Sequence, residues 1–334
     1  MTTYRITLTP LEPYFFGNEK NFNFGTNVGQ KAQSNYYIKS DYTPSQSTLL
    51  GMLRYLGLKH VNSDFKYTDQ EIKDNNDAVG KESFKFDSTS EQCFGNIHRI
   101  YPLHIINNNT YYARTPLDHS TGSSYSPFKE YTDTMLPTDF HSKDRDVSSY
   151  VNLDTLEIVD MSDIFIRHDR IGIKQFSTEE GFFKKQFISM KNGYSFCFFA
   201  DLDGDWKDSL VYLGQNKSLF KVSFEKKDND VNISKLFEMH PFKNRIAYCI
   251  SDSFLDETVY NCCEFTAINT RDFRSLTTIP SANNYLKRFS KSSTLIHIIE
   301  AGSVFIVSDD KTNEFDLISN HQAKKIGFNN IWRG

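Results

Sequence analysis

The hydrophobic pattern of the chain has a period of two near the start and a helical period after residue 41. Residues 4–8 alternate apolar and polar side chains, which predicts a short strand with one buried face. Within residues 41–58, the apolar positions follow the i, i+3, i+4, i+7 spacing of a helix that packs on a core. These positions are Leu49, Met52, Leu53 and Leu56.

Both ends of this helix carry recognisable signals. Thr43 followed by Gln46 forms a capping-box pattern, and Pro44 suits the first helical position, where no N–H is needed. Gly57 suits a left-handed position just after the helix. Gly51 is unusual, because a glycine inside a helix costs about 1 kcal/mol relative to alanine. We therefore expect another backbone to approach the helix closely at Gly51.

Strand patterns dominate the rest of the chain. A helix is predicted within residues 64–90, and residues 99–106 and 110–114 read as a hairpin around three asparagines. Residues 120–149 are polar and without periodicity, which predicts a long surface loop. Further strands are predicted at residues 164–167, 182–188, 194–201, 212–213, 220–224, 245–251, 264–269, 294–300 and 303–307. The last two flank Ala301 and Gly302, which predicts a tight hairpin.

Length and composition point to an aromatic-rich α+β protein of two domains. The chain has 334 residues, including 29 Phe and 18 Tyr, and this length favours two domains. We predict domains at residues 1–163 and 164–334, whose elements can interleave. Each half mixes strands with one or two helices, so the two could be copies of one small fold.

Charge and cysteine content exclude several classes of protein. The net charge is −4, so the chain does not coat nucleic acid through bulk charge, and a nucleic-acid site has to be local. Five cysteines without a CxxC pair indicate free thiols in a reducing cytoplasm. The first residues do not resemble a signal peptide, and no apolar run approaches the ~20 residues of a membrane span.

The sequence contains no recognisable motif for binding a metal or a cofactor. The aspartates at 201–205 resemble a calcium loop, but Gly204 is fourth rather than sixth and Tyr212 holds the twelfth position. His168 and Asp169 lack further ligands at a workable spacing. Nucleotide-binding and nucleophile-elbow motifs are also missing from the sequence. We expect no metal, no cofactor and no small-molecule substrate.

The start of the predicted helix is a candidate anion site. Ser45, Gln46 and Ser47 bring hydroxyls, an amide and free N–H groups to the positive end of the helix dipole. The simpler interpretation is an ordinary capped helix.

Two other segments carry local positive charge. A loose basic run, interrupted by Glu179 and Glu180, consists of Arg167, His168, Arg170, Lys174, Lys184 and Lys185. By composition it reads as a solvated face, because charged residues are rarely buried. The tail is free of acidic residues after Asp316. It combines cations and aromatics with glycine, as single-stranded RNA binding requires, although its aromatics could instead complete a core. The tail residues in question are Lys324, Lys325, Gly327, Phe328, Trp332 and Arg333.

Six short blocks, taken in order, resemble one protein family. The blocks are PLEPYFFG, TPSQSTLLGMLR, RIGIKQFSTEEGFF, VYLGQNKSLFKV, IEAGSVFIV and KKIGFNNIW. Each block is weakly specific, but their order and spacing span most of the chain. Together they are similar to the third subunit of the Cmr complex, the type III-B CRISPR effector, within the RAMP superfamily. The sister subunit of type III-A complexes is the nearest relative that could be confused with it.

The resemblance implies two ferredoxin-like, RRM-type domains with long loop insertions and no catalytic activity. It also implies that the chain holds the 5′ tag of the CRISPR RNA and joins the large polymerase/cyclase subunit to the backbone nuclease subunits. Carried over by position, it places RNA at Ser45, Gln46, Ser47, Arg54, Arg170, Lys174, Lys324, Lys325, Gly327 and Phe328.

Two other functions stay open from the sequence. The first is a metal-independent endoribonuclease of the same superfamily that processes CRISPR precursor RNA, with His60, His168 or His321 as its acid or base. No histidine is paired with a second catalytic group in a recognisable motif. The second is a carbohydrate-binding β-protein, suggested by the aromatics, which would require a secretion signal.

Overall fold

A computed structural model describes the chain in several stretches. They are residues 1–17, 37–62, 66–86, 91–118, 143, 149–174, 181–227, 245–278, 289–291, 294–319 and 321–333. These residues form a mixed α and β structure with few helices and mostly antiparallel sheets, which agrees with the predicted α+β class. None of the helices in these stretches has the length and apolar content needed to cross a bilayer.

The largest sheet in the described residues has nine strands in the order β11-β12-β1-β10-β4-β5-β6-β7, with β3 also paired to β10. The strands are β1 (Thr2–Pro10), β3 (Ile97–Ile100), β4 (His104–Asn107), β5 (Thr110–Arg114), β6 (Ser149–Asn152), β7 (Ile158–Asp160), β10 (Tyr194–Leu202), β11 (Ser209–Leu213) and β12 (Ser218–Lys227). Strands from both predicted domains therefore share one sheet, while the boundary at residue 163 stays a prediction.

Strand β1 lies inside this sheet, as its alternation predicts. Tyr4, Ile6 and Leu8 are buried, and Ile6 pairs with Phe198 of β10 on one side and Phe224 of β12 on the other. The predicted hairpin after residue 99 is also confirmed, since β4 pairs with β5. The turn between them places Asn108 and Asn109 at positive φ, which asparagine tolerates better than most residues.

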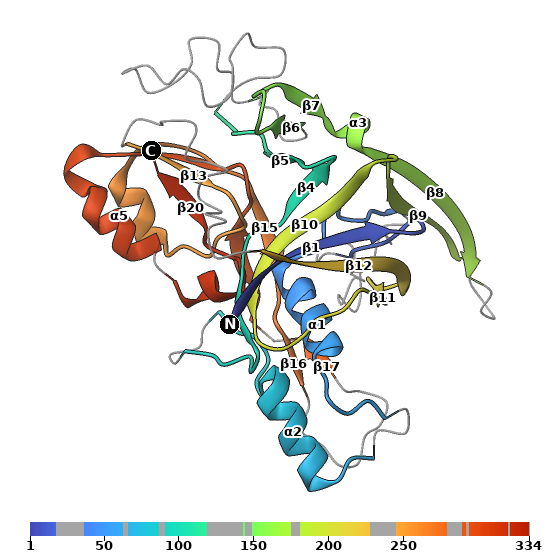
Figure 1. The fold of residues 1–334 in the computed structure, drawn as a ribbon. Helices are drawn as coiled ribbons and strands as arrows, with labels where there is room; N and C mark the ends of the chain where they lie inside the picture. The colour runs from blue at the N-terminus through green and yellow to red at the C-terminus, as the bar shows by residue number, and fades with distance from the viewer. Residues whose placement is uncertain are drawn as a thin grey trace, which may run out of the picture.

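Helix α1 (Gln46–Leu56) packs under this sheet and carries the predicted apolar stripe (Figure 1). Its start differs from the prediction, because the N-cap is Ser45, whose hydroxyl accepts from the N–H of Thr48, rather than Thr43. Gly57 has a φ of −85°, so it is not left-handed. No other described segment of the chain approaches Gly51 closely, since a Cβ there would meet no atom within 4 Å, while the approach of an RNA backbone stays a prediction.

A separate sheet of four strands has the order β14-β19-β13-β20. Its strands are β13 (Ile246–Cys249), β14 (Cys263–Ala267), β19 (Val304–Val307) and β20 (Ile331–Arg333). Helix α5 (Thr312–Ser319) covers it at the left of Figure 1 together with η2 (Glu257–Cys262). The other short elements are α3 (Met161–Ile164), η3 (Asp309–Lys311) and η4 (Gln322–Ile326).

Smaller pairings complete the described fold. Strand β15 (Thr270–Phe273) pairs with β18 (Ile296–Ile299), and β16 (Leu276–Thr278) pairs with β17 (Phe289–Lys291). The predicted hairpin around Ala301 and Gly302 is wrong, because β18 and β19 enter different sheets. Only a local turn joins them, in which Ser303 N–H donates to the carbonyl of Glu300 at 3.2 Å.

Two further features lie at the periphery. Helix α2 (Asp69–Val79) confirms the helix predicted within residues 64–90 and begins with a capping box between Thr68 and Glu71. A long hairpin of β8 (Phe165–Lys174) and β9 (Gly181–Met190) projects at the right of Figure 1, with β2 (Tyr37–Ile38) parallel to β9. The predicted loop at 120–149 lies almost entirely outside the described residues.

Candidate nucleic-acid interface

A groove of about 740 Å³ runs beside α1 and brings three of the predicted RNA-binding residues together. Its walls are α1, the end of β11 with the turn after it, and residues 271–275 at the end of β15. Ser45, Ser47 and Arg54 all line it. We name this space the α1 groove.

The N-terminal end of α1 supplies hydroxyl groups to the groove. Ser45 Oγ lies 2.9 Å from Ser47 Oγ and 3.0 Å from Thr48 Oγ1, while it accepts from the Thr48 N–H at 3.3 Å. These hydroxyls hydrogen-bond to one another, and each can rotate to donate to an anion instead. Because they stand at the positive end of the helix dipole, the start of the groove favours a phosphate.

Arg54 supplies a positive charge on the same helix. Its guanidinium donates from Nη2 to the carbonyl of Gly80 at 2.7 Å and from Nη1 to the carbonyl of Glu82 at 3.0 Å. Burial lowers the pKa of Arg54 from its ordinary value, yet arginine stays charged in proteins. No carboxylate within the described ranges forms an ion pair with it. The charge is therefore held at the groove by neutral acceptors.

Two exposed tyrosines line the groove, and the sequence analysis missed both. Tyr55 on α1 is 57% exposed and Tyr212 on β11 is 68% exposed. Between these elements, Gly51 leaves the surface of α1 open. Exposed aromatic rings beside a positive charge are the features on which unpaired bases stack. Tyr212 could have been found from the alternation of β11, which predicts its side chain on the face opposite Val211.

Arginines on the opposite wall were also missed. Arg271 forms an ion pair with Asp41 at 3.3 Å and another with Asp252. Arg274 lines the groove a few residues further on. With Arg54, three arginines line the groove beside two aspartates, Asp41 and Asp272. Because Asp252 also pairs with Arg271, positive and negative side chains are balanced around the groove.

Gln46 and Gly327 meet in the interior rather than at the surface. Gln46 is buried, with its amide oriented to donate to the carbonyl of Ile326 at 3.2 Å and to accept from the Leu103 N–H at 3.0 Å. Gly327 follows η4 with a φ of 91°, and it is buried against the side-chain amide of Gln46. The structure thus gives both residues a role in joining α1 to the C-terminal loop.

Phe328 lies in the core, which corrects the expectation that its ring is exposed for base stacking. It is fully buried and stacks on Phe84 with ring centroids 5.7 Å apart. It also makes an edge-to-face contact with Phe86, with ring centroids 4.9 Å apart. The alternative weighed for the tail, aromatics that complete a core, describes Phe328 correctly.

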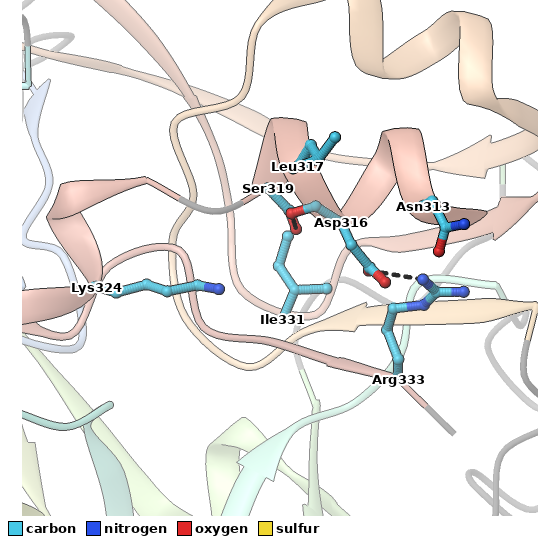
Figure 2. Close-up of a pocket in the computed structure, with 7 residues that line it drawn as sticks. All are labelled: Asn313, Asp316, Leu317, Ser319, Lys324, Ile331 and Arg333. Carbon is cyan, nitrogen blue, oxygen red and sulfur yellow. Dashed lines mark hydrogen bonds and ion pairs between the residues drawn. The ribbon is translucent and has the colours of Figure 1, made fainter. Parts of the chain in front are cut away.

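The two tail lysines lie on a different surface from the groove. Lys325 is paired with Glu91 at 2.9 Å. Lys324 extends into a second pocket of about 480 Å³ beside α5 and β20, where Arg333 is paired with Asp316 at 2.6 Å (Figure 2). Burial lowers the pKa of Lys324 from its ordinary value, and the nearby Arg99 adds to the shift.

The basic run on the β8–β9 hairpin forms a third location. Arg170 is exposed, and its guanidinium carbon lies 4.4 Å from the ring centroid of Phe187. Lys174 ends β8, and its side chain lies outside the described residues. Arg170 does not line the α1 groove. The predicted residues whose side chains the structure describes are therefore distributed over three surfaces and the core, and Ser45, Ser47 and Arg54 come together in the α1 groove.

The histidines of the endoribonuclease alternative occupy separate elements. His60 lies 3.1 Å from Asp74 beside α2, and His168 lies 2.7 Å from the Ser189 hydroxyl on the hairpin. His321 caps η4, where its Nδ1 accepts from the Ala323 N–H at 3.1 Å, and burial lowers its pKa. Among the described residues, no three His, Cys, Asp or Glu side chains gather as a metal site.

Comparisons with known proteins give a likeness of fold. No protein-family profile matches the sequence, and neither does any curated protein. A chain of the type III-B Cmr-beta complex bound to cognate target RNA and AMPPnP matches with a TM-score of 0.50 at 14% identity, over 98% of this chain and 95% of that one. At this identity the match shows a shared fold.

Two weaker matches come from type III-A CRISPR assemblies. One is a chain of a Csm3–Csm4 subcomplex, with a TM-score of 0.40 at 10% identity over 91% of this chain and 93% of that one. The other is from a Csm1–Csm4 cassette in complex with pppApA, with a TM-score of 0.37 at 11% identity over 92% and 87%. TM-scores below 0.5 do not establish a shared fold.

Proposed function

We propose that this chain is an RNA-binding subunit of a type III-B CRISPR effector complex, equivalent to the third subunit of Cmr. The fold shared with a chain of an RNA-bound Cmr complex supports this proposal, as does the order of the sequence blocks. We further propose that its elements form two ferredoxin-like, RRM-type domains, at residues 1–163 and 164–334, which interleave in the nine-stranded sheet.

The α1 groove carries the RNA-binding part of the proposal. Its hydroxyls at Ser45 and Ser47, the charge of Arg54 and the exposed rings of Tyr55 and Tyr212 combine a phosphate site with stacking surfaces. Such a combination suits a short single strand better than a duplex, whose bases are already stacked. We propose that the 5′ tag of the CRISPR RNA lies in this groove.

We propose that the chain is a structural subunit of a cytoplasmic complex, with no catalytic activity and no cofactor of its own. Its partners are the CRISPR RNA, the large polymerase/cyclase subunit and a backbone nuclease subunit. The projecting β8–β9 hairpin and the α5 side are well separated on the molecule (Figure 1), which suits contacts with two different neighbours. The basic residues Arg170, Lys174, Lys324 and Lys325 lie on these two sides.

The test is binding of fluorescent RNA that carries the 5′ tag, compared with a scrambled tag, across a salt series. The full chain should prefer the tag, with a salt slope equivalent to about 2–4 phosphates. Gly51→Leu fills the groove from an exposed helix position. Ser47→Glu adds a negative charge that the helix dipole itself favours, so it should repel RNA without harming the fold.

Both variants should weaken tag binding by about tenfold or more, the effect of losing ~1.4 kcal/mol of interaction. Asn192→Glu makes an equal change of charge on an exposed turn outside the groove and should bind as the wild type does. Equal, weak binding of both RNAs by the wild type would contradict the tag-holding function. Loss of binding in Lys324→Ala/Lys325→Ala alone would move the site to the tail.

A further inference from the structure

The pocket of about 480 Å³ beside α5 lies apart from the α1 groove, since the two share no lining residue. We name it the α5 pocket. Helix α5 forms one wall, where Asn313, Asp316 and Leu317 share a face of the helix at the spacing i, i+3, i+4. Lys324 of η4 lies on the opposite side, and Ile331 of β20 lies between the two (Figure 2).

Lys324 brings an unpaired positive charge into the α5 pocket. Its ammonium forms no hydrogen bond or ion pair with any residue in the described stretches, and its side chain reaches toward Ile331 (Figure 2). Burial lowers the pKa of Lys324, and the charge of Arg99 adds to the shift. The fold therefore disfavours the charged form of this lysine, and an anion placed at its ammonium would offset that cost.

The other charged residues of the α5 pocket already neutralise each other. Arg333 pairs with Asp316 at 2.6 Å. Of the described residues that line the pocket, Lys324 is then the one whose charge has no partner. The pocket is therefore complementary to a group with one negative charge.

Apolar surface lies next to this charge. Leu317 is 78% exposed, whereas Phe315 on the inner side of α5 is fully buried against Phe305, with ring centroids 5.6 Å apart. Ile331 is only partly buried. A single exposed leucine is common on protein surfaces. Here it borders a hollow that also holds an unpaired cation, so the pocket offers an ionic and an apolar contact together.

We propose that the α5 pocket binds a segment of a partner protein that carries a carboxylate next to a large aliphatic side chain. The carboxylate accepts from the Lys324 ammonium, and the aliphatic side chain packs between Leu317 and Ile331. An RNA phosphate would use the charge alone and leave Leu317 in water. The inference deepens the proposed function and rests on it, because it names the chemistry of the subunit contact on the α5 side.

The experiment titrates capped tetrapeptides into solutions of the full chain and follows binding by NMR of the peptide. Gly-Glu-Leu-Gly should bind with a Kd on the order of 1 mM, as expected for one aliphatic side chain and one ion pair. Gly-Gln-Leu-Gly should bind about fivefold more weakly because it lacks the charge. Gly-Glu-Ser-Gly should bind about tenfold more weakly because it lacks the apolar side chain.

Variants of the protein assign each half of the contact. In Lys324→Met the Glu and Gln peptides should bind equally, and Leu317→Ser should lose most of its preference for Leu over Ser in the peptide. Lys207→Met and Leu210→Ser make the same changes at exposed positions outside the pocket and should keep both preferences. Equal binding of all three peptides by the wild type, or a preference for Glu that persists in Lys324→Met, would overturn the proposal.

A thermal melt separates docking from folding. Because the ammonium of Lys324 has no partner within the described stretches, Lys324→Met should leave the melting temperature of the free protein unchanged or raise it. A lowered melting temperature would overturn the assignment, since the lysine would then have a structural partner.

Other occupants of the α5 pocket give different results. Weaker binding of tag RNA by Lys324→Met would overturn the proposal in favour of an RNA phosphate. A wild-type dimer that Leu317→Ser dissociates would overturn it in favour of a second copy of the chain. Peptide binding requires no RNA, so failure of the tag to bind would contradict the RNA-binding proposal alone. Failure of the peptides to bind, with tag binding intact, would overturn this inference alone.

Discussion

Gly327 packs directly against the side-chain amide of Gln46 and so joins the C-terminal loop to the start of α1. Gly327 has a φ of 91°, and a Cβ at this position would lie 2.6 Å from the Gln46 amide and 3.0 Å from the carbonyl oxygen of Tyr101. Ser45 and Ser47, which flank Gln46, face the α1 groove. The packing of the last residues of the chain therefore fixes the position of the candidate phosphate site.

Gly327→Ala should destabilise the protein by about 3 kcal/mol or more, because it combines left-handed strain with a steric clash. Gly204→Ala is the matched control, since Gly204 has a φ of 92° but open space around the new Cβ. It should cost about 1–2 kcal/mol from the backbone alone. Urea unfolding measures both. Equal losses would show that the contact with Gln46 does not constrain the loop.

Gly51→Ala should stabilise the protein by about 1 kcal/mol, since alanine favours the helix interior and its Cβ meets nothing within 4 Å. Gly57→Ala, at the C-cap of α1, should do the opposite. Its Cβ would lie 2.9 Å from Trp206 Cη2 and 3.2 Å from the carbonyl oxygen of Leu53. Thermal unfolding distinguishes the two signs, and a destabilising Gly51→Ala would mean that the surface of α1 is covered there.

Glu300→Gln should become more stabilising, relative to the wild type, as the pH rises. Burial raises the pKa of Glu300 in the folded state, so stability from this group is fully present below its unfolded pKa, near 4.5, and is lost as the pH rises through the folded pKa. Glutamine does not ionise and avoids this loss. Urea unfolding at pH 4, 6 and 8 gives the difference at each pH.

Glu91→Gln is the control, for which we expect the opposite dependence of stability on pH. The hydrogen bond from Lys325 lowers the pKa of Glu91, so its stabilising effect is present above the unfolded pKa and is lost as the pH falls through the folded one. The stability difference from the wild type should therefore shrink toward acid pH. If the Glu300 and Glu91 variants varied with pH in the same direction, the burial of Glu300 would be contradicted.

Repeat RNA incubated with the purified chain in EDTA should remain intact. His60, His168 and His321 are on separate elements and are bonded to Asp74, Ser189 and the Ala323 N–H, respectively. Denaturing gels read the result. Specific cleavage that is lost in one histidine-to-alanine variant would favour the endoribonuclease, and cleavage that persists in all three would indicate a contaminant.

The local pattern of residues was sufficient to predict an element wherever its structure depends mainly on its neighbours in sequence. The stripe of α1, the alternation of β1 and the asparagine turn between β4 and β5 were all predicted correctly. Three of the residues predicted to bind RNA, Ser45, Ser47 and Arg54, line one groove, and their role in binding stays a prediction. The cap at Thr43 failed because Thr43 and Ser45 are both good N-cap residues, and the start of the helix is decided by packing.

The sequence by itself determined the α+β character of this protein and the polar start of α1, because helix and strand periods are properties of neighbouring residues. Only the tertiary structure decided that Phe328 lies in the core and that Tyr212 and Arg274 line the groove. It also decided that β18 and β19 separate into different sheets. The position of Phe328 and the lining of the groove depend on contacts between segments more than a hundred residues apart, and the separation of β18 from β19 depends on pairing with earlier, non-adjacent strands. Composition and spacing do not encode which distant segments meet.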